Sequence, residues 1–398
     1  MGIEDLDGSV WKSRRVFVRV DFNVPLGPDG VGDDTRIRAA LPTIRYLAER
    51  SAKVILASHL GRPKGKTAPE YSLAPVARRL EELVGTPVAF APDCVGPAAE
   101  EAASRLEDGQ VLLLENLRFY PGEEKGDDAF ARSLATLAEA YVNDAFGAAH
   151  RAHASTTVVA KYLSPAVAGL LMLAELEALG RLLRDPPRPF VAVLGGAKVS
   201  DKLGVIGRLM GLVDTLALGG GMANTFLLAR GHSLGESLVE PDLAGEARRL
   251  EAQATAMGKR LLLPEDVVVA ESATAGAARR VVAPPEVPGG WRAVDIGPAS
   301  AARYSEEIRQ AGSVFWNGPV GVFEIEPFMA GTRELAKAVA ECRGFTVVGG
   351  GDSAAALTQL GLEQEVSHLS TGGGASLEFI EGKALPGVEC LDVKKESR

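Results

Sequence analysis

The sequence predicts an α/β protein built from two units, each with a parallel β-sheet covered by helices. Eight short apolar runs recur along the chain, and each is followed by glycine or polar residues and then by a segment with helical spacing. The runs are RVFVRV (15–20), KVILAS (53–58), VLLLEN (111–116), AYVNDA (140–145), FVAVLGG (190–196), TLALGGG (215–221), SVFWNG (313–318) and FTVVGGG (345–351). Continuous apolar runs are typical of strands buried on both faces of a parallel sheet.

The length of the chain predicts more than one hydrophobic core. The chain has 398 residues, and an ordinary domain has about 150, so we expect two or three domains. The best boundary lies at 170–190, where one helical stripe is formed by Leu170, Leu173, Leu176, Leu179 and Leu183. Asp185-Pro186-Pro187 ends this helix, and a second unit begins at Phe190. The alternative is one large sheet with an internal helix.

The composition indicates a globular protein of the cytoplasm. Hydrophobic residues make up 46% and charged residues 24%, and the net charge is −9. This balance argues against a broadly basic nucleic-acid face, so an anion site must be a local cluster of positive charge. The N-terminus lacks the basic and apolar regions of a signal peptide. The longest apolar segment is interrupted by Glu175, well before the ~20 residues that a membrane span needs.

The three cysteines predict neither a disulfide framework nor a zinc site. Cys94, Cys342 and Cys390 are odd in number, far apart and without C-x-x-C spacing or histidine companions. We expect free thiols in a reducing compartment.

The segment KVILASHLGRPKGKT (53–67) resembles a phosphate-binding P-loop but does not match it. The P-loop pattern G-x-x-x-x-G-K-[ST] wraps successive backbone N–H groups around a phosphate. Counting back from Gly65, the first glycine should stand at position 60, but Leu60 stands there and the available glycine is Gly61. The loop is one residue short, so His59 and Arg62 need another explanation.

Polar residues that follow the strands of the first half predict a site for a small anion. Ligands of open parallel sheets bind beyond the carboxyl ends of the strands. In the first half these positions carry Asp21, Asn23, His59, Arg62, Arg118, Asn143, His150 and Arg151, and Arg36 stands at the start of a predicted helix. Several arginines that converge from separate strands suit a phosphate or carboxylate, which guanidinium groups bind in a bidentate manner. His150 and His153 have no visible third metal ligand, and we expect them to be structural.

The same positions of the second half carry glycine runs, which predict a nucleotide site. The runs are LGGAKVSDK (194–202), LGGGMAN (218–224), WNGPVGVFE (316–324), VVGGGDSAA (347–355) and STGGGAS (370–376). Glycine lets backbone N–H groups approach a phosphate, and a following helix N-terminus adds partial positive charge. Asp352 could hold Mg²⁺ through oxygen. Lys198 and Lys202, four residues apart, would share a face if their segment is helical.

One glycine run also satisfies a dinucleotide-binding pattern. Residues 349–354, GGGDSA, match G-x-G-x-x-A after a strand. The acidic residue that should bind the ribose ~20 residues further on is absent, since Ser370 and Thr371 stand there. A nucleotide half and an anion half together favour phosphoryl transfer, with an NAD-dependent dehydrogenase and a two-lobed small-anion-binding protein as the alternatives.

The motifs of the whole chain resemble those of the phosphoglycerate kinase family. They are RVDFNVP, RIRAALP, SHLGRP, LENLRF, FGAAHRAHAS, LGGAKVSDK, GGGMANTF, WNGPVGVFE, GGGDS and STGGGASLEFIEGK, in family order from about residue 16 to 387. The resemblance implies a monomer of two Rossmann-like domains, 1–170 and 190–376. It also implies a hinge helix at 171–189, a segment 377–398 that returns to the first domain, and an active site in the cleft between the domains.

The resemblance also implies the ligands and the residues that bind them. The first domain should bind 3-phosphoglycerate or 1,3-bisphosphoglycerate through Asp21, Phe22, Asn23, Arg36, His59, Leu60, Gly61, Arg62, Arg118 and Arg151. The second should bind ATP or ADP through Gly196, Lys202, Gly219, Gly220, Asn317, Pro319, Glu324, Gly350, Gly351, Asp352 and Ser353, with Asp352 on Mg²⁺. Two departures from the family are visible: Ala293-Val294 replaces a common Gly-Leu, and Ser353 stands where threonine is common.

The implied reaction needs no general base. The attacking group is a carboxylate, whose ordinary pKa near 4 keeps it ionised at neutral pH. The chain indeed shows neither a protein-kinase H-R-D signature nor a Ser/His/Asp set. Catalysis should therefore consist of positioning and charge stabilisation by Arg36, Lys198, Lys202, Mg²⁺ and the backbone N–H groups at the predicted helix start around Gly373.

Overall fold

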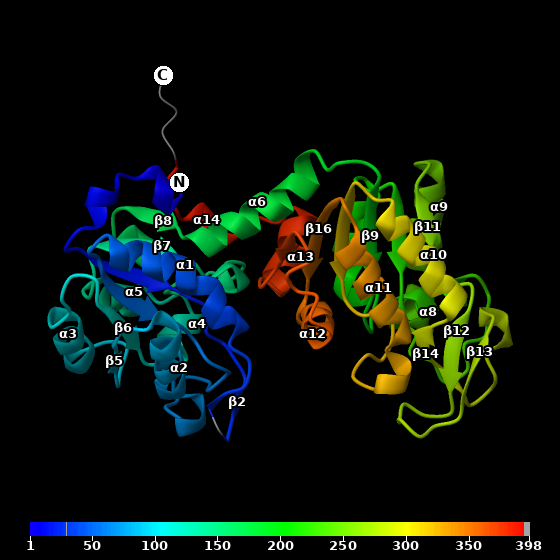
Figure 1. Cartoon of the computed structure of the whole chain (residues 1–398), viewed down its shortest axis with the longest axis horizontal. Coiled ribbons are helices and arrows are strands. Elements are labelled where there is room, and N and C mark those ends of the chain that lie inside the picture. The colour runs from blue at the N-terminus through cyan, green and yellow to red at the C-terminus, as the bar shows by residue number, and fades with distance from the viewer. Residues whose placement is uncertain (29, 394–398) are drawn as a thin grey trace. The chain divides into compact units, whose positions relative to one another are not determined.

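The computed structural model describes residues 1–28 and 30–393, which form two compact units. Unit 1 comprises Met1–Glu177 together with the segment from Ala384 onward, and unit 2 comprises Ala178–Lys383. The chain passes from unit 1 to unit 2 within the helix α6 (Leu170–Arg184) (Figure 1). It returns to unit 1 at Ala384, whereas the sequence put this return at 377.

Unit 1 is built on a six-stranded parallel sheet in the order β5-β6-β4-β1-β7-β8. The strands are β1 (Arg15–Arg19), β4 (Lys53–Ala57), β5 (Val88–Ala91), β6 (Val111–Leu114), β7 (Ala140–Asn143) and β8 (Ala166–Ala168). A short antiparallel pair, β2 (Leu26–Gly27) and β3 (Gly30–Val31), lies outside this sheet.

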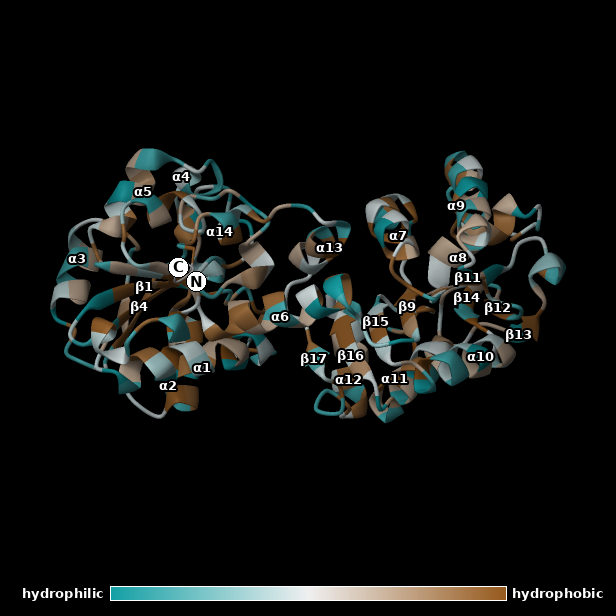
Figure 2. Cartoon of the chain, turned by 90° about the horizontal axis from the view of Figure 1, so that it is seen from above, coloured by the Kyte–Doolittle hydropathy of each residue, from teal (hydrophilic) through white to brown (hydrophobic). Residues whose placement is uncertain are grey.

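Helices cover both faces of the unit 1 sheet. They are α1 (Thr35–Glu49), α2 (Ala74–Val84), α3 (Pro97–Ser104), α4 (Pro121–Glu124), α5 (Asp128–Ala135) and α14 (Pro386–Glu389). Figure 2 shows α1 and α2 on one face of β1 and β4, and α4 and α5 on the other. Single 3₁₀ turns lie at Ile3–Asp5, Gly8–Trp11, Pro69–Tyr71, Leu117–Phe119, Phe146–Ala148 and Val158–Lys161. The strands are buried on both sides, which is why they read as continuous apolar runs.

Unit 2 repeats this architecture with the strand order β11-β10-β9-β15-β16-β17, again fully parallel. Its strands are β9 (Phe190–Leu194), β10 (Thr215–Leu218), β11 (Arg260–Leu262), β15 (Ser313–Asn317), β16 (Phe345–Gly349) and β17 (His368–Leu369). Its helices are α7 (Leu203–Met210), α8 (Gly220–Ala229), α9 (Ala244–Ala256), α10 (Pro298–Arg309), α11 (Ala330–Glu341), α12 (Gly351–Leu360) and α13 (Gly374–Glu381). In Figure 2, α10, α11 and α12 lie on one side of the sheet and α7, α8 and α9 on the other.

Unit 2 also contains a three-stranded antiparallel sheet, which was not predicted. Its order is β13-β12-β14, with β12 (Val267–Ala270), β13 (Arg279–Val282) and β14 (Arg292–Ile296). Three 3₁₀ turns, Pro241–Leu243, Pro284–Glu286 and Glu326–Phe328, lie in the loops around it, and a fourth, Ser200–Lys202, precedes α7.

The predicted fold class is confirmed, and the single-sheet alternative is wrong. All eight apolar runs form strands, and they fall into two separate sheets. The predicted leucine stripe forms α6, which ends at Arg184 directly before Asp185-Pro186-Pro187. Among the helices of residues 1–28 and 30–393, none is long and apolar enough to cross a membrane.

The strand order of each sheet creates a place for a ligand at the carboxyl ends of its central strands. In unit 1 the chain runs outward from β1 through β4 and then crosses to β7 on the other side of β1. In unit 2 it runs from β9 through β10 and then crosses to β15 on the other side of β9. Such switch points leave a crevice beyond the carboxyl ends of the two central strands.

Candidate active site

The predicted anion-binding residues of unit 1 follow four neighbouring strands, β6-β4-β1-β7. Residues 21–23 follow β1, residues 59–62 follow β4, Arg118 follows β6, and Arg151 follows β7. Because the four strands are parallel, these residues start from one edge of the sheet. Arg36 joins them from the first turn of α1.

Arg36 and Asp21 form an ion pair at this edge. Nη1 of Arg36 donates a hydrogen bond to the carboxylate of Asp21, which is 9% exposed. Burial raises the pKa of Asp21, but the positive charges that face it, among which Arg36 and Arg19 are permanent, hold its pKa below the ordinary value. Asp21 is therefore ionised at neutral pH, and its charge directs the guanidinium of Arg36.

Hydrogen bonds to the backbone hold the loop that follows β4. Asn116 accepts a hydrogen bond from the N–H of Leu60 at 3.2 Å and donates one to its carbonyl at 2.7 Å. Oδ1 of Asn23 accepts one from the N–H of Gly61 at 2.8 Å. Gly61 has a φ of 61°, and a Cβ there would lie 2.3 Å from the ring of Tyr71. Glycine is therefore required at this turn.

Two residues predicted to bind substrate turn their side chains into the core. Phe22 and Leu60 belong to the hydrophobic cluster beneath the sheet edge, and the N–H of Phe22 donates to Oγ of Ser58 at 2.8 Å. Neither side chain is available to a ligand, so these two residues shape the loops. Arg62, in contrast, is exposed.

The near-miss P-loop is not a P-loop. The element that follows β4 is the 3₁₀ turn Pro69–Tyr71, and no helix begins at residues 65–67. Lys64, Lys66 and Thr67 are exposed. A P-loop needs a helix N-terminus directly after its lysine, so this segment lacks the structure that binds a phosphate.

Arg118 and Arg151 add two further positive charges at the carboxyl end of the unit 1 sheet. Arg118 is 4% exposed; its Nη1 donates to the carbonyl of Gly61 at 2.7 Å, and its Nε lies 3.3 Å from Oε1 of Glu124. Nε of Arg151 donates to Nε2 of His150 at 3.0 Å. Burial, together with the charges of the nearby Arg19, Arg118 and Arg151, lowers the pKa of His153 to about 4. His153 is therefore neutral.

Sequence reasoning missed Arg19, the last residue of β1. Its side chain has no solvent exposure and lies among the predicted residues: Nη2 is 3.1 Å from Nδ1 of His59. The available signal was the charge itself, because an arginine inside a strand buried on both faces needs partners that an apolar run does not supply.

Asn143 serves the structure of unit 1 rather than a ligand. Its Nδ2 donates to the carbonyl of Gly387 at 2.8 Å, and its Oδ1 accepts from the N–H of Ala145 at 3.2 Å. The N–H of Gly387 in turn donates to the carbonyl of Ala149 at 2.8 Å. Asn143 thus attaches the returning segment to the end of β7.

The predicted nucleotide-binding residues of unit 2 also follow four neighbouring strands, β10-β9-β15-β16. Gly219 and Gly220 follow β10, residues 196–202 follow β9, residues 317–324 lie at and after the end of β15, and residues 350–353 follow β16. The two units therefore offer corresponding edges, one lined by arginine and one by glycine.

Lys202 sits at the switch point of unit 2. Its Nζ donates to the carbonyl oxygens of Gly195, which directly follows β9, at 2.7 Å and of Asn317, which ends β15, at 3.0 Å. Gly318 has a φ of 94°, and a Cβ there would lie 2.9 Å from this Nζ, so glycine keeps the space open. Burial lowers the pKa of Lys202 to about 8, although Asp352 counteracts the shift.

Lys198 does not share a helical face with Lys202. The 3₁₀ turn Ser200–Lys202 and then α7 follow it, and Lys198 itself is exposed before the turn. Glu240 holds the turn: its carboxylate accepts from the N–H of Ser200 at 3.0 Å and from its hydroxyl at 2.6 Å. Lys198 is thus an exposed side chain close to the carboxylate that fixes the turn, and its charge contributes to lowering the pKa of Glu240.

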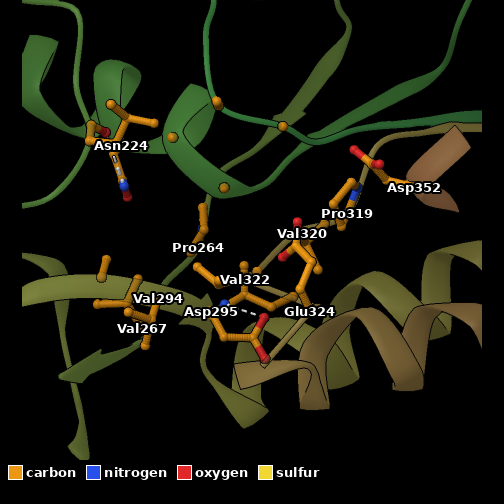
Figure 3. A pocket seen from close by; sticks show the side chains of 18 residues that line it. Asn224, Pro264, Val267, Val294, Asp295, Pro319, Val320, Val322, Glu324 and Asp352 are labelled. Carbon is orange, nitrogen blue, oxygen red and sulfur yellow. Dashed lines mark hydrogen bonds between the residues drawn. The ribbon is translucent and has the colours of Figure 1, made fainter. Parts of the chain in front are cut away.

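A pocket of about 260 Å³ lies between the glycine-rich loops and the antiparallel sheet of unit 2. Its walls are largely apolar, with Pro264, Val267, Val294 and Val322 among them, while Asn224, Asp295, Glu324 and Asp352 supply polar groups (Figure 3). Of the predicted residues, five line this pocket: Gly196, Gly220, Pro319, Glu324 and Asp352. An apolar pocket with a few polar groups suits a flat heterocyclic ring. The departure at Ala293-Val294 forms part of the wall.

The N-terminus of α12 supplies donors beside this pocket. Gly350, with a φ of 90°, precedes the helix, and Asp352 is exposed in its first turn. Asn317 is 3% exposed, and its Nδ2 has no hydrogen-bond partner within the described residues. An unpaired buried amide is costly unless a ligand completes it. Gly373 precedes α13, which follows the edge strand β17, and is not among the residues that line the pocket.

Asp352 is the side chain that fits Mg²⁺. Residues 1–28 and 30–393 contain no group of three or more histidine, cysteine, aspartate or glutamate side chains placed to hold a metal. Mg²⁺ that accompanies a nucleotide needs only one or two carboxylates, because phosphates and water complete its shell. The single exposed carboxylate of Asp352 meets that requirement. Cys94, Cys342 and Cys390 are free thiols, as predicted.

Comparison with known proteins decides between the possible functions. The model of the family described as "Phosphoglycerate kinase" matches residues 3–383. The chain belongs to the phosphoglycerate kinase family. It is 58% identical over 392 residues to the phosphoglycerate kinase of Roseiflexus castenholzii, with 98% of each chain covered. It is 59% identical over 382 residues to that of Moorella thermoacetica, with 96% of this chain and 97% of the relative covered.

Solved structures agree with this assignment. The structure of phosphoglycerate kinase from Coxiella burnetii superposes with a TM-score of 0.86 at 42% identity and 98% coverage of both chains. The protein is thus a phosphotransferase that acts on a carboxyl group, in the reversible glycolytic reaction of ATP with 3-phosphoglycerate to give ADP and 1,3-bisphosphoglycerate. The dehydrogenase and anion-binding alternatives are wrong.

Proposed function

We propose that unit 1 binds 3-phosphoglycerate and that unit 2 binds Mg-ATP. The first assignment is supported by the positive charges at the carboxyl end of the unit 1 sheet. Arg118 and Arg151 lie close to His59, and Asp21 directs Arg36 in the same region. Arg62 is exposed after β4. A phosphomonoester and a carboxylate are both anions that guanidinium groups bind through paired hydrogen bonds. Asn23, Phe22, Leu60 and Gly61 shape the loops that present these groups.

The observation that carries the second assignment is the pocket of unit 2. Its apolar part suits adenine, and Gly219, Gly220 and Pro319 form the adjacent adenosine side. Glu324 lines this pocket, and in the proposed complex it accepts hydrogen bonds from the ribose hydroxyls. Gly196, Lys202 and Asn317, with Gly350, Gly351 and Ser353 at the N-terminus of α12, then face the phosphates. Asp352 holds Mg²⁺, which supplies positive charge to the nucleotide phosphates when it is bound.

Catalysis in this scheme is electrostatic. The attacking carboxylate is already ionised at neutral pH, so no side chain has to remove a proton. Arg36 from unit 1 and Lys198 and Lys202 from unit 2 place positive charge around the migrating phosphoryl group, and the N–H groups at Gly373 add partial charge. Lys198 is exposed and lies on a loop, so its long side chain can follow that group.

Transfer requires the ligands of the two units to meet. We propose that α6 with the residues up to 189 is a hinge, that a monomer closes about it, and that closure expels water from the reacting groups. The moving bodies of this proposal are the two units of the fold, Met1–Glu177 with the segment from Ala384, and Ala178–Lys383, in place of the expected boundaries 1–170, 190–376 and 377–398. We also propose that the protein works in the cytoplasm.

A coupled assay tests the scheme. We expect Mg²⁺-dependent formation of an acyl phosphate from 3-phosphoglycerate and ATP. Isothermal titration of 3-phosphoglycerate into the Arg62→Ala and Glu324→Ala variants then separates the halves: the first should lose binding and the second should keep it. Loss of 3-phosphoglycerate binding in Glu324→Ala would contradict the division of ligands between the units.

A further inference from the structure

Arg19 belongs to a buried chain of side chains that the proposed reaction does not use. Nε of Arg19 donates to Oγ of Ser155 at 2.8 Å, and this hydroxyl donates to Oε1 of Glu123 at 2.6 Å. The N–H of Ser155 donates to Oε2 of Glu123 at 3.0 Å. Arg19, Ser155 and Glu123 all have 0% exposure. The guanidinium is therefore held from the end of β1, from the loop after β7 and from α4.

The other two nitrogens of the guanidinium have partners of their own. Nη1 donates to the carbonyl of Val20, and Nη2 lies 3.1 Å from Nδ1 of His59. A guanidinium has only donors. Nδ1 of His59 must therefore present its lone pair to Nη2, and the proton of the neutral imidazole must sit on Nε2.

The remaining charges around His59 agree with a neutral ring. Arg118 and Arg151 also face it, and burial together with the three arginines drives the pKa of His59 well below its ordinary value. Asp21 opposes this shift, but its Oδ1 lies 3.9 Å from Nδ1, beyond hydrogen-bond reach. Nδ1 therefore accepts a hydrogen bond from Arg19 and does not donate one to Asp21.

We propose that Arg19 is a positioning residue that holds His59 as the Nε2–H tautomer, so that His59 meets the substrate as a neutral hydrogen-bond donor. This inference rests on the proposed place of His59 in the 3-phosphoglycerate site. Ser155 and Glu123 fix the guanidinium, so that one nitrogen stays aimed at Nδ1. A lysine could not replace Arg19, because a single ammonium cannot reach Ser155, Val20 and His59 from one fixed plane.

The tautomer is measured without substrate. The chain contains 5 histidines, so long-range ¹H–¹⁵N correlation on histidine-labelled protein resolves the rings, and His59→Gln assigns the signal of His59. We expect a protonated Nε2 and an unprotonated Nδ1 at pH 7. A proton on Nδ1, or an imidazolium, would overturn the proposal even if every variant failed to fold.

Variants test the positioning role. In Arg19→Met the His59 proton should move to Nδ1, toward Asp21, and the KM for 3-phosphoglycerate should rise about tenfold, the cost of one charge-assisted hydrogen bond. The KM for ATP should stay within about twofold, since uniform loss of the fold would change both. Ser155→Ala changes no charge and should show the same tautomer shift in part.

Two outcomes would contradict the proposal and leave the proposed function intact. One is an unchanged Nε2–H signal in both variants; the other is a tautomer shift with no change in the KM for 3-phosphoglycerate. If instead His59→Gln itself leaves that KM unchanged, the place of His59 in the substrate site is wrong.

Discussion

The hydroxyl of Ser353 accepts a hydrogen bond from the backbone N–H of Gly318 at 2.6 Å. Ser353 is fully buried in the first turn of α12, and Gly318 follows β15. One side chain therefore links the two loops that surround Lys202, and the family's more common threonine would carry the same hydroxyl.

Replacement of Ser353 tests this link. Ser353→Ala leaves the N–H of Gly318 buried and unpaired, so we expect a loss of about 1–3 kcal/mol in the free energy of unfolding and a several-fold rise in the KM for ATP. Ser353→Thr keeps the hydroxyl and should retain the KM for ATP. Urea unfolding and steady-state kinetics provide the measurements. An equal rise of the KM for ATP in Ser353→Ala and Ser353→Thr would show that the hydrogen bond to Gly318 does not determine this KM.

The pH dependence of activity should report Lys202. Its pKa is lowered to about 8 by burial, so the ammonium that we assign to the phosphates is lost as the pH rises through 8. We expect kcat/KM for ATP to fall by up to about tenfold per pH unit above this value, since kcat/KM reports groups of the free enzyme. Lys202→Arg keeps its charge above pH 8 and should remove this fall in kcat/KM. A fall that persists in Lys202→Arg would assign the pH dependence to another group.

The same pKa makes a prediction for stability. Between about 8 and the ordinary value of 10.5, unfolded Lys202 holds a proton that folded Lys202 lacks. The contribution of Lys202 to the free energy of unfolding therefore rises with pH across this window and is constant below it. Lys202→Met should abolish that slope in urea titrations at pH 8–10, and an unchanged slope would assign it to other groups.

Arg36 should act on the chemical step. Arg36→Ala removes the charge that Asp21 directs, and we expect kcat to fall by about two orders of magnitude or more with an ATP affinity near wild type. Arg38→Ala is the matched control, because Arg38 lies two residues further along α1, is 55% exposed and pairs only with Asp34 among the acidic side chains of the described chain. A near-normal kcat for Arg36→Ala would remove Arg36 from the catalytic set.

Arg118 should act on binding. We expect Arg118→Ala to raise the KM for 3-phosphoglycerate by about 10–100-fold with a smaller effect on kcat, because the contact with the phosphate that we propose for Arg118 is equal in the ground and transition states. Arg132→Ala, on an exposed arginine of α5, is the control. A rise in the KM for ATP instead would contradict the division of labour between the units.

Strands and their loops could be predicted because each depends on a few adjacent residues. The apolar residues of a run such as FVAVLGG are enough to indicate a buried strand. Asp21, His59 and Arg118 follow such runs closely. The parallel sheet then brings loops distant in sequence to one edge. Short or half-exposed elements gave no such signal. The antiparallel sheet β13-β12-β14 was missed because β12 and β13 have only four residues each and β13 is largely exposed.

Partnerships between side chains could not be predicted. The burial of Arg19 depends on Ser155 and Glu123, which are distant in sequence. Arg19 and Ser155 are 136 residues apart. Phe22 packs into the core, whereas its neighbour Asn23 accepts a hydrogen bond from Gly61. This difference depends on how the loops after β1 and β4 contact each other. Sequence alone also left the shared helical face of Lys198 and Lys202 open, and the 3₁₀ turn at Ser200–Lys202 rules it out.

The segment that Asn143 attaches to β7 sets an order for synthesis. Gly387 and Asp392 supply hydrogen bonds to Asn143, Ala149 and Ala166 of unit 1, and they leave the ribosome after every residue of unit 2. Unit 2 can complete its sheet during translation, whereas unit 1 must wait, with β7 and the arginine loops already made, for a stretch that comes after the other domain. A nascent chain stalled before Gly387 would thus carry a finished unit 2 and an unfinished unit 1.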